Sequence, residues 1–192
     1  METTATVPFT KRLWDRLGWV GAVIIVAIVA ILIAYFSTPV KTEAVLAATI
    51  RASTPLVLGA MCGLLGERTG IINIGIEGQM LLGAFVGFLV NVYTGNLFLA
   101  VMSGILTGMV MGLFLAWMSV NLKMDQIIGG TVINTLALGL SSYFYVIGLN
   151  TKGKLQTIPL GPLADIPLIG PVLFNNPPIT YLAIILVFVV QF

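Results

Sequence analysis

Residues 66–78 concentrate the polar chemistry of this chain. The segment reads Gly-Glu-Arg-Thr-Gly-Ile-Ile-Asn-Ile-Gly-Ile-Glu-Gly and carries two acids, one base, one amide and four glycines between two strongly apolar stretches. Hydrocarbon solvates such groups poorly, and one charged side chain at the centre of a bilayer costs roughly 3 kcal/mol on insertion scales. We therefore expect the segment either to reach the aqueous face of a membrane or to line a polar cavity inside a helix bundle.

Two side chains of this segment are candidates for contact with a polar solute. Asn73 either caps the next helix through its free backbone donors or belongs to a broken-helix entrance that lines a cavity. Glu77 either pairs with Arg68 or with a helix terminus, or it faces a translocation pathway. The residue types leave both pairs of alternatives open.

Three further polar residues lie within apolar stretches outside this segment. Asn134 and Thr135 fall in a long apolar run, where an amide either bonds to a neighbouring helix or forms the wall of a cavity that solvates a solute. Arg51 either extends to the lipid headgroups or faces a translocation path. We include all three residues among the candidates for the pathway.

Composition places the chain in a membrane. Hydrophobic residues make up 58% of the sequence and charged residues 8%, whereas a soluble domain carries about 25% charged residues. The net charge of +2 is too small to indicate a nucleic-acid partner. With one cysteine and no histidine, the chain cannot form an internal disulfide, and a metal site is not expected. We expect Cys62 to be a small core residue.

The apolar runs predict an all-α, polytopic membrane helix bundle with about six transmembrane helices. Pro55 lacks a backbone donor and disfavours helix at the residue before it, so an amphipathic piece over 42–53 should precede a kinked helix. Residues 1–17 form a basic lead and not a cleaved signal peptide, because the apolar run after it is long enough to span a membrane. The predicted helices cover residues 18–36, 54–65, 74–92, 97–120, 127–149 and a last one from 179.

With the N-terminal lead in the cytoplasm, helix parity assigns the connections to the two sides of the membrane. Residues 66–73 and 121–126 then lie on the cytoplasmic side, and residues 91–96 and the proline-rich loop 150–178 lie outside. Within that loop, residues 166–174 are apolar enough to form a short lid or re-entrant piece.

The last apolar run, 179–192, is shorter than a full span. At 1.5 Å per residue it would reach about 21 Å, against a hydrocarbon core of about 30 Å. We therefore expect a C-terminally truncated fragment, with a transmembrane domain over residues 18–192 that is incomplete at its C-terminal end.

Small residues recur at helical spacing along several of these runs. Such ridges allow helix backbones to approach closely in a membrane, where lipid provides no hydrophobic drive for association. The pattern predicts a closely packed bundle. The residues are Gly59, Gly63, Gly83, Gly87, Gly104, Gly108 and Gly112.

Three stretches resemble a known family. Residues 66–85 closely resemble the signature of bacterial ABC-importer permeases of the ribose and branched-chain amino acid type. Residues 125–134, continuing through 136–140, are similar to the second of two paralogous permeases in the simple-sugar and nucleoside branch, and residues 166–171 match as well. The resemblance extends from residue 43 to residue 192.

This resemblance implies the first repeat of a type II-like importer permease in a bacterial plasma membrane. It implies a heterodimer with a paralogous permease, a cytoplasmic ABC ATPase that binds ATP and Mg²⁺, and an extracytoplasmic solute-binding lipoprotein. The chain itself would bind no cofactor, and a nucleoside or simple sugar would cross by alternating access. Family members are longer, and their coupling helix follows the segment that ends here at Phe192. The structural or gating motif would comprise Gly66, Glu67, Arg68, Gly70, Gly75 and Gly78.

Other functions remain open from the residues alone. The same architecture could carry branched-chain amino acids or another small polar solute, or the chain could be a non-transporting membrane scaffold or an inactive fragment. An enzyme is the weakest alternative, because the sequence contains neither a nucleotide-binding glycine loop nor a serine–histidine–aspartate set. Any ATP hydrolysis would therefore take place in a separate subunit.

Overall fold

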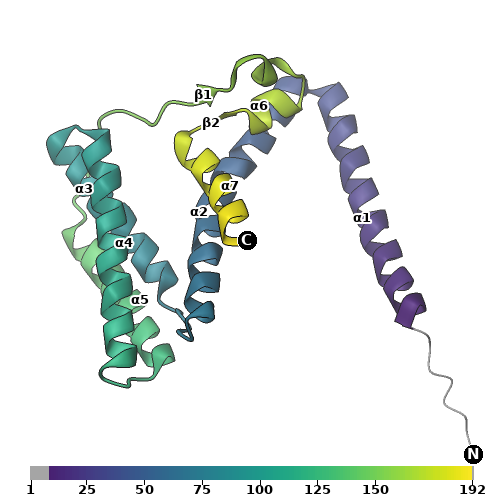
Figure 1. Ribbon diagram of the computed structural model, residues 1–192. Coiled ribbons are helices and arrows are strands. Elements are labelled where there is room, and N and C mark those ends of the chain that lie inside the picture. Colours follow the sequence, from purple (N-terminus) through teal and green to yellow (C-terminus); the bar gives the residue numbers. More distant parts are fainter. Residues whose placement is uncertain (1–8, 192) are drawn as a thin grey trace, which may run out of the picture. The chain divides into compact units, whose positions relative to one another are not determined.

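A computed structural model describes residues 9–191, with the side chains of residues 9–17, 19 and 22 outside that description. The described residues are mainly helical (Figure 1), so the predicted all-α class is confirmed. The helices are α1 (Phe9–Ser37), α2 (Pro39–Arg68), α3 (Ile76–Thr94), α4 (Leu97–Val120), α5 (Gln126–Phe144), η1 (Gly161–Asp165), α6 (Ile169–Leu173) and α7 (Pro178–Gln191), and two short strands are β1 (Ile158–Pro159) and β2 (Asn175–Asn176).

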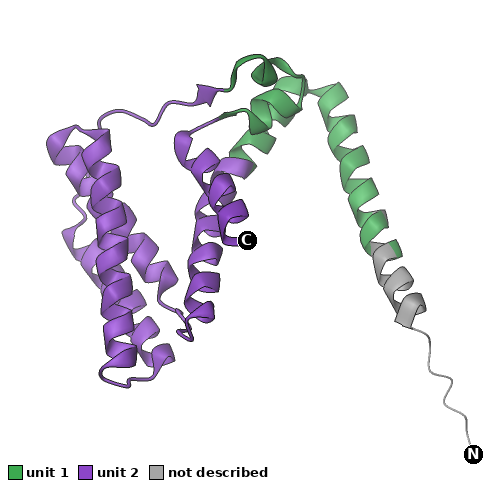
Figure 2. Ribbon diagram, in the orientation of Figure 1, with its two compact units in different colours: residues 1–49, 160–175 green, residues 50–159, 176–192 purple. Residues whose placement is uncertain are grey.

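The chain divides into two compact units, which Figure 2 shows in different colours. Unit 1 comprises residues 1–49 and 160–175, and unit 2 comprises residues 50–159 and 176–192. The predicted N-terminal lead, 1–17, lies partly outside the described residues, and α1 begins within it at Phe9. All the polar candidates from the sequence belong to unit 2.

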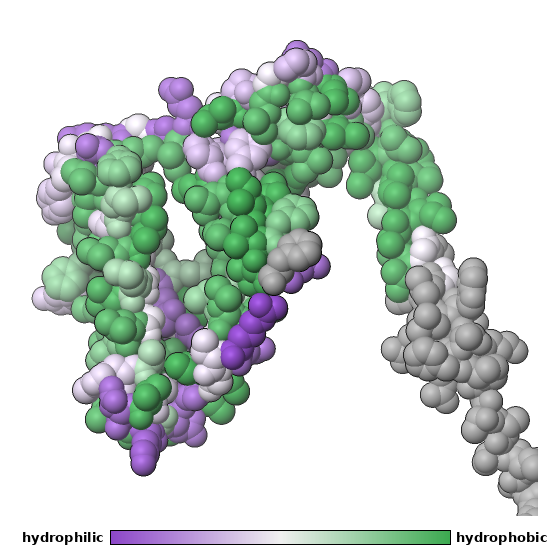
Figure 3. Space-filling model, in the orientation of Figure 1, coloured by the Kyte–Doolittle hydropathy of each residue, from purple (hydrophilic) through white to green (hydrophobic). Residues whose placement is uncertain are grey.

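Four helices, α2 to α5, are long and apolar enough to cross a membrane. Two shorter apolar helical stretches, Val23–Ser37 and Pro178–Gln191, accompany them among the described residues. In Figure 3 the sides of the unit 2 helices are largely hydrophobic, and hydrophilic residues gather mainly toward the helix ends. Most large apolar side chains are exposed on this surface, as expected for helices whose solvent is lipid.

Unit 1 contains the short helices of the proline-rich loop. α6 packs against η1, and Gly170 lies so close to the Ala164 carbonyl that a Cβ atom would not fit there. The Leu168 amide, in the left-handed region at φ +67°, donates to Glu43 Oε1 at 3.4 Å. The apolar residues 166–174 thus fold as a turn and a short helix on a polar anchor.

α2 corrects the predicted break at Thr54. The helix runs without interruption from Pro39 to Arg68 and contains Pro55. Proline removes one backbone donor, but hydroxyl groups can satisfy backbone acceptors inside a membrane helix. Ser53 Oγ and Thr54 Oγ1 both donate to the Ile50 carbonyl, at 2.9 and 3.0 Å. The carbonyl that residue 55 would pair with in an α-helix is that of Arg51, so these bonds lie one position before it and add support to the preceding turn.

The core of unit 2 is the contact between α3 and α4, supported by α5. A Cβ atom at Gly83 would lie 3.2 Å from the Gly104 carbonyl oxygen, and one at Gly87 would lie 3.0 Å from the Ala100 carbonyl oxygen. The predicted small-residue packing therefore holds for this pair of helices. It does not hold for Gly108 and Gly112, which face open space within the described residues.

Several helix ends differ from the predicted ones. α3 begins at Ile76, not residue 74, and extends through Asn91 to Thr94. α5 ends at Phe144, not residue 149, because the backbone becomes extended at Tyr145 (φ −73°, ψ 120°) and Gly148 adopts a positive φ of 99°. β-Branched and aromatic residues such as those at 145–147 favour extended backbone when no neighbour supports a helix.

α4 has the predicted bounds, 97–120, because polar caps define the helix ends on both of its connections. Asn96 Oδ1 accepts hydrogen bonds from the amides of Phe98 and Leu99 at the start of α4. Asp125 Oδ1 accepts from the Ile127 amide at 2.8 Å and caps α5 in the same way.

Cys62 is exposed, so the expectation of a core position is wrong for the described part of the chain. Its side chain lies on a face of α2 that borders a cavity of about 750 Å³, together with Gly59, Met80 and Gly104.

Candidate functional site

Residues 69–75 form the connection between the end of α2 and the start of α3. The amides of Thr69 and Ile71 both donate to the Gly66 carbonyl, at 2.9 and 3.0 Å. Gly70 has a φ of +81°, a conformation that side chains disfavour. The polar segment is therefore an ordered turn between two membrane helices.

Gln126, in the first turn of α5, holds this turn from the side. Its Oε1 accepts from the Ile72 amide at 2.7 Å, and its Nε2 donates to the Gly70 carbonyl at 3.3 Å. One side-chain amide thus pairs with a backbone donor and a backbone acceptor, as a neighbouring strand would. The sequence analysis assigned Gln126 only to a polar turn.

Asn134 caps α3 from the neighbouring helix. Its Oδ1 accepts from the Gly78 amide at 2.7 Å, and its Nδ2 donates to the Ile74 carbonyl at 3.2 Å. The first amides of a helix have no partner within the helix, and the N-cap residue of α3, Gly75, makes no side-chain cap hydrogen bond. Asn134 supplies that partner, so the interhelical hydrogen bond predicted as one alternative is present.

Glycines make this cap possible. A Cβ atom at Gly78 would lie 2.7 Å from both the Cα and the Oδ1 of Asn134, and one at Gly130 would lie 2.7 Å from the Gly75 nitrogen. Real Cβ atoms do not approach other atoms so closely. The motif glycines Gly75 and Gly78 therefore let the backbones of α3 and α5 meet.

Asn73 does not cap α3, which corrects one of its two predicted roles. Its Nδ2 donates to Gln79 Oε1 at 3.0 Å, and Gln79 Nε2 donates back to Asn73 Oδ1 at 3.4 Å. Gln79 is buried, so this amide pair satisfies polar groups away from solvent. The pair ties the turn to the second turn of α3.

Glu67 and Glu77 lie beside one pocket of about 880 Å³ between α2 and α3, together with Asn73. Both carboxylate residues are exposed. Arg68 donates through Nη1 to the Val190 carbonyl at 3.2 Å, which places it on α7 and not on Glu77. The arrangement presents two acids and an amide to a space that a polar solute or water can enter.

Arg51 and Thr135 are not part of this cluster. Arg51 Nε donates to Asn176 Oδ1 at 3.3 Å, and Asn176 is fully buried. The Asn176 amide donates to the Tyr181 hydroxyl at 3.0 Å, so Arg51 supports the entry into α7. Thr135 is exposed and donates only to the Thr131 carbonyl of its own helix, at 3.0 Å.

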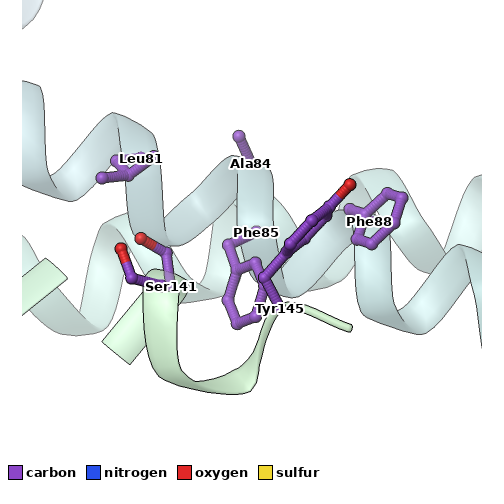
Figure 4. Close-up of a pocket in the computed structure, with 7 residues that line it drawn as sticks. Leu81, Ala84, Phe85, Phe88, Ser141 and Tyr145 are labelled. Carbon is purple, nitrogen blue, oxygen red and sulfur yellow. The ribbon is translucent and has the colours of Figure 1, made fainter. Parts of the chain in front are cut away.

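A second pocket, of about 520 Å³, lies between the middle of α3 and the C-terminal end of α5 (Figure 4). The ring centroids of Phe88 and Tyr145 are 6.4 Å apart with an interplanar angle of 34°. Ser141 donates to the Leu138 carbonyl at 3.2 Å. The lining residues are Leu81, Ala84, Phe85, Phe88, Ser141, Ser142 and Tyr145.

Ser141 and Ser142 lie in an apolar run, and nothing in the sequence connects them with the aromatic residues of α3. The sequence analysis placed Asn91 in a turn, whereas Asn91 is buried in α3. Its Nδ2 donates to the Lys152 carbonyl at 3.1 Å, and its Oδ1 accepts from the Lys152 amide at 2.7 Å. A single asparagine near the end of an apolar run was the available signal.

Comparison with known proteins gives several relatives. A protein of Haloferax volcanii with the provisional name glucose ABC transporter permease protein is 37% identical over 150 residues, which cover 76% of this chain and 46% of that protein. The guanosine ABC transporter permease protein of Bacillus subtilis is 33% identical, with 76% and 50% covered. The nucleoside ABC transporter permease protein of Lactococcus lactis subsp. cremoris is 35% identical, with 65% and 43% covered.

The chain thus spans about half the length of these relatives or less. No solved structure matches it. The model of the family described as branched-chain amino acid transport system / permease component matches residues 45–192, which include the turn 66–78, its clamps on α5 and the second pocket. The chain belongs to this permease family.

Proposed function

We propose that this protein is the permease subunit of an ATP-binding-cassette importer that moves a nucleoside or a simple sugar into the cell by alternating access. The observation that carries the proposal is the family match over residues 45–192. The names of the relatives, which cover glucose, guanosine and nucleosides, support this class of solute.

The proposed assembly contains a paralogous permease, a cytoplasmic ATPase that binds ATP and Mg²⁺, and an extracytoplasmic solute-binding lipoprotein. The chain lies in a bacterial plasma membrane with its N-terminus in the cytoplasm. It binds no cofactor and hydrolyses no ATP itself. Its part in transport is to form one wall of the path for the solute.

Within that wall, the pocket beside Glu67, Asn73 and Glu77 is the proposed polar station near the cytoplasmic side. Exposed carboxylates and an amide can bond to the hydroxyl groups of a neutral solute. Asn134 contributes by fixing the start of α3, from which Glu77 projects. Arg51 and Thr135 are proposed contacts at other points of the path.

Reconstitution of the complete transporter in proteoliposomes tests the proposal. ATP-dependent uptake of radiolabelled guanosine or glucose, lost when the ATPase subunit is omitted, is the expected result. The family description favours branched-chain amino acids as a second solute class, so leucine uptake is measured in parallel. Uptake of leucine alone would replace the proposed solute class, and no ATP-dependent uptake of any solute would favour a scaffold.

A further inference from the structure

We propose that the pocket between the middle of α3 and the C-terminal end of α5 binds a ribonucleoside, with the base stacked on an aromatic wall and the ribose bonded to hydroxyl groups. The proposal rests on the proposed import function and names the substrate class at one site. The pocket is separate from the one beside Glu67 and Glu77, which lies between α2 and α3, although α3 contributes to both. Its volume of about 520 Å³ is in the usual range for small-molecule sites.

The aromatic wall comes from both helices. Phe85 and Phe88 line the pocket from α3, and Tyr145 lines it from the end of α5 (Figure 4). Tyr145 is 55% exposed, so its ring retains a surface that a ligand can cover. Flat heteroaromatic bases stack on such side chains. The pocket beside Glu67 and Glu77, by contrast, has no aromatic lining residue.

The end of α5 determines where this ring lies. Tyr145 is the C-cap residue, and its extended backbone takes the chain out of the helix at this point. Had α5 continued to residue 149 as its apolar sequence predicts, Tyr145 would occupy a helical position within the run. The early end also leaves the last carbonyl groups of α5 without partners in the helix, and these groups can accept hydrogen bonds.

The hydroxyl groups of the pocket are available to a ligand. Within residues 9–191, the hydroxyl groups of Ser142 and Tyr145 make no hydrogen bond. Ser141 donates to the Leu138 carbonyl, which leaves its oxygen free to accept. A ribose offers several hydroxyl groups that both donate and accept, so it matches this set.

The charge of the site also fits a neutral ligand. None of the residues that line the pocket carries a formal charge. A phosphorylated nucleotide would bring anionic oxygens into a site without a cation, which is unfavourable. The chemistry therefore indicates a nucleoside and not a nucleotide.

Cysteine protection tests occupancy directly. Cys62 is the one cysteine of these 192 residues, so Ser142→Cys is placed in a Cys62→Ala background. Its labelling in the complete transporter in membranes is measured by mass spectrometry on the peptide that contains residue 142. A thiol reagent is applied with and without guanosine. At about ten times its dissociation constant, guanosine leaves roughly one site in eleven free, so labelling should slow about tenfold. Tyr143→Cys is the matched control, because Tyr143 is exposed and does not line the pocket.

Three outcomes would overturn the proposal. The first is labelling of Ser142→Cys that guanosine does not slow. The second is protection by ribose or glucose but not by guanosine, which would identify a sugar site. The third is a thiol that is blocked in the complete transporter without any solute but reactive in the separate chain, which would indicate a subunit contact.

Guanosine uptake by the transporter with unaltered α3 and α5 separates this proposal from the proposed function. Absence of uptake of every tested solute would reject the import function, whereas guanosine uptake without protection at residue 142 would reject only the site. Among pocket variants, Tyr145→Leu should raise the KM for guanosine about tenfold through loss of stacking. Tyr145→Phe keeps the ring and should raise the KM less, mainly for nucleosides with an intact ribose.

Discussion

α3 and α5 meet at two places with opposite chemistry. Near Gly78 the two backbones touch, and the Asn134 amide uses both its donor and its acceptor on α3. Near Phe88 aromatic side chains line a pocket, and the Ser142 hydroxyl has no partner within the described residues. The two helices are in direct contact at Gly78, and they line a pocket at Phe88.

The difference shows that residue type alone does not identify a binding position in a membrane helix. Asn134 and Ser142 lie on the same helix, roughly two turns apart. The asparagine has the more polar side chain and was a candidate for the solute pathway. Its amide instead bonds to the backbone of the neighbouring helix α3. What distinguishes the two positions is the space opposite: glycines at one, aromatic rings at the other.

Gly78→Ala should lower stability most, because it disrupts the direct contact between α3 and α5. The added Cβ would lie 2.7 Å from Asn134 Cα, and overpacking of this kind costs about 1–3 kcal/mol. The apparent melting temperature in detergent should fall clearly. Gly139→Ala on α5 is the control, since nothing lies within 4 Å of its added Cβ. Equal melting temperatures of the two variants would contradict a close contact between Gly78 and Asn134.

Asn134→Leu should have the second-largest effect on stability, because it replaces the capping amide with an apolar side chain of similar size. The partly buried Gly78 amide would lose its partner, which costs about 1–3 kcal/mol, whereas the bond to the Ile74 carbonyl is exposed and contributes less. Asn134→Asp keeps the acceptor for the Gly78 amide and should lie between Leu and the natural residue. Thr135→Val is the neighbouring control. Unchanged melting with reduced uptake would instead assign Asn134 to the cavity wall.

Gln126→Ala should loosen the turn without separating the helices. It removes hydrogen bonds to Ile72 and Gly70, each worth about 1 kcal/mol. Hydrogen exchange at the Ile72 amide should accelerate about tenfold, while exchange in the α3–α4 contact stays the same. Unchanged exchange at Ile72 would show that the Gly66 carbonyl bonds alone hold the turn.

Glu77→Gln should have the smallest effect on stability, because Glu77 is exposed and has nearly the same shape as glutamine. Insertion and melting should match the unaltered protein, whereas uptake by the complete transporter should fall if the carboxylate contacts the solute. Normal uptake in this variant would return Glu77 to a structural role.

The sequence predicted most helices because apolar runs and polar turns report directly on the lipid environment. α4 is correct to the residue, since asparagine and glycine precede it and a polar turn follows. The break predicted before Pro55 was wrong, because a membrane helix can tolerate the loss of one backbone donor at proline. The early end of α5 was missed because Tyr145 to Leu149 remains apolar, and apolarity does not distinguish helix from extended chain.

The candidate site was predicted in part. Residues 69–75 connect α2 and α3 through a hydrogen-bonded turn, and Asn134 bonds to a neighbouring helix. The sequence could not show that Asn134 and Gln126 act on the same turn, because that depends on how α5 packs against α3. It also could not pair Phe88 with Tyr145, which are 57 positions apart in the chain.

The side-chain amide of Asn91 forms both of its hydrogen bonds with backbone atoms of residue 152. Any amino acid with a backbone N–H can therefore occupy position 152, and only proline would remove the hydrogen bond from that N–H to Asn91 Oδ1. Position 91 has no such freedom, because a substitute would need a side chain of the same length with both a hydrogen-bond donor and an acceptor. Related sequences should accordingly drift at 152 while position 91 stays constant.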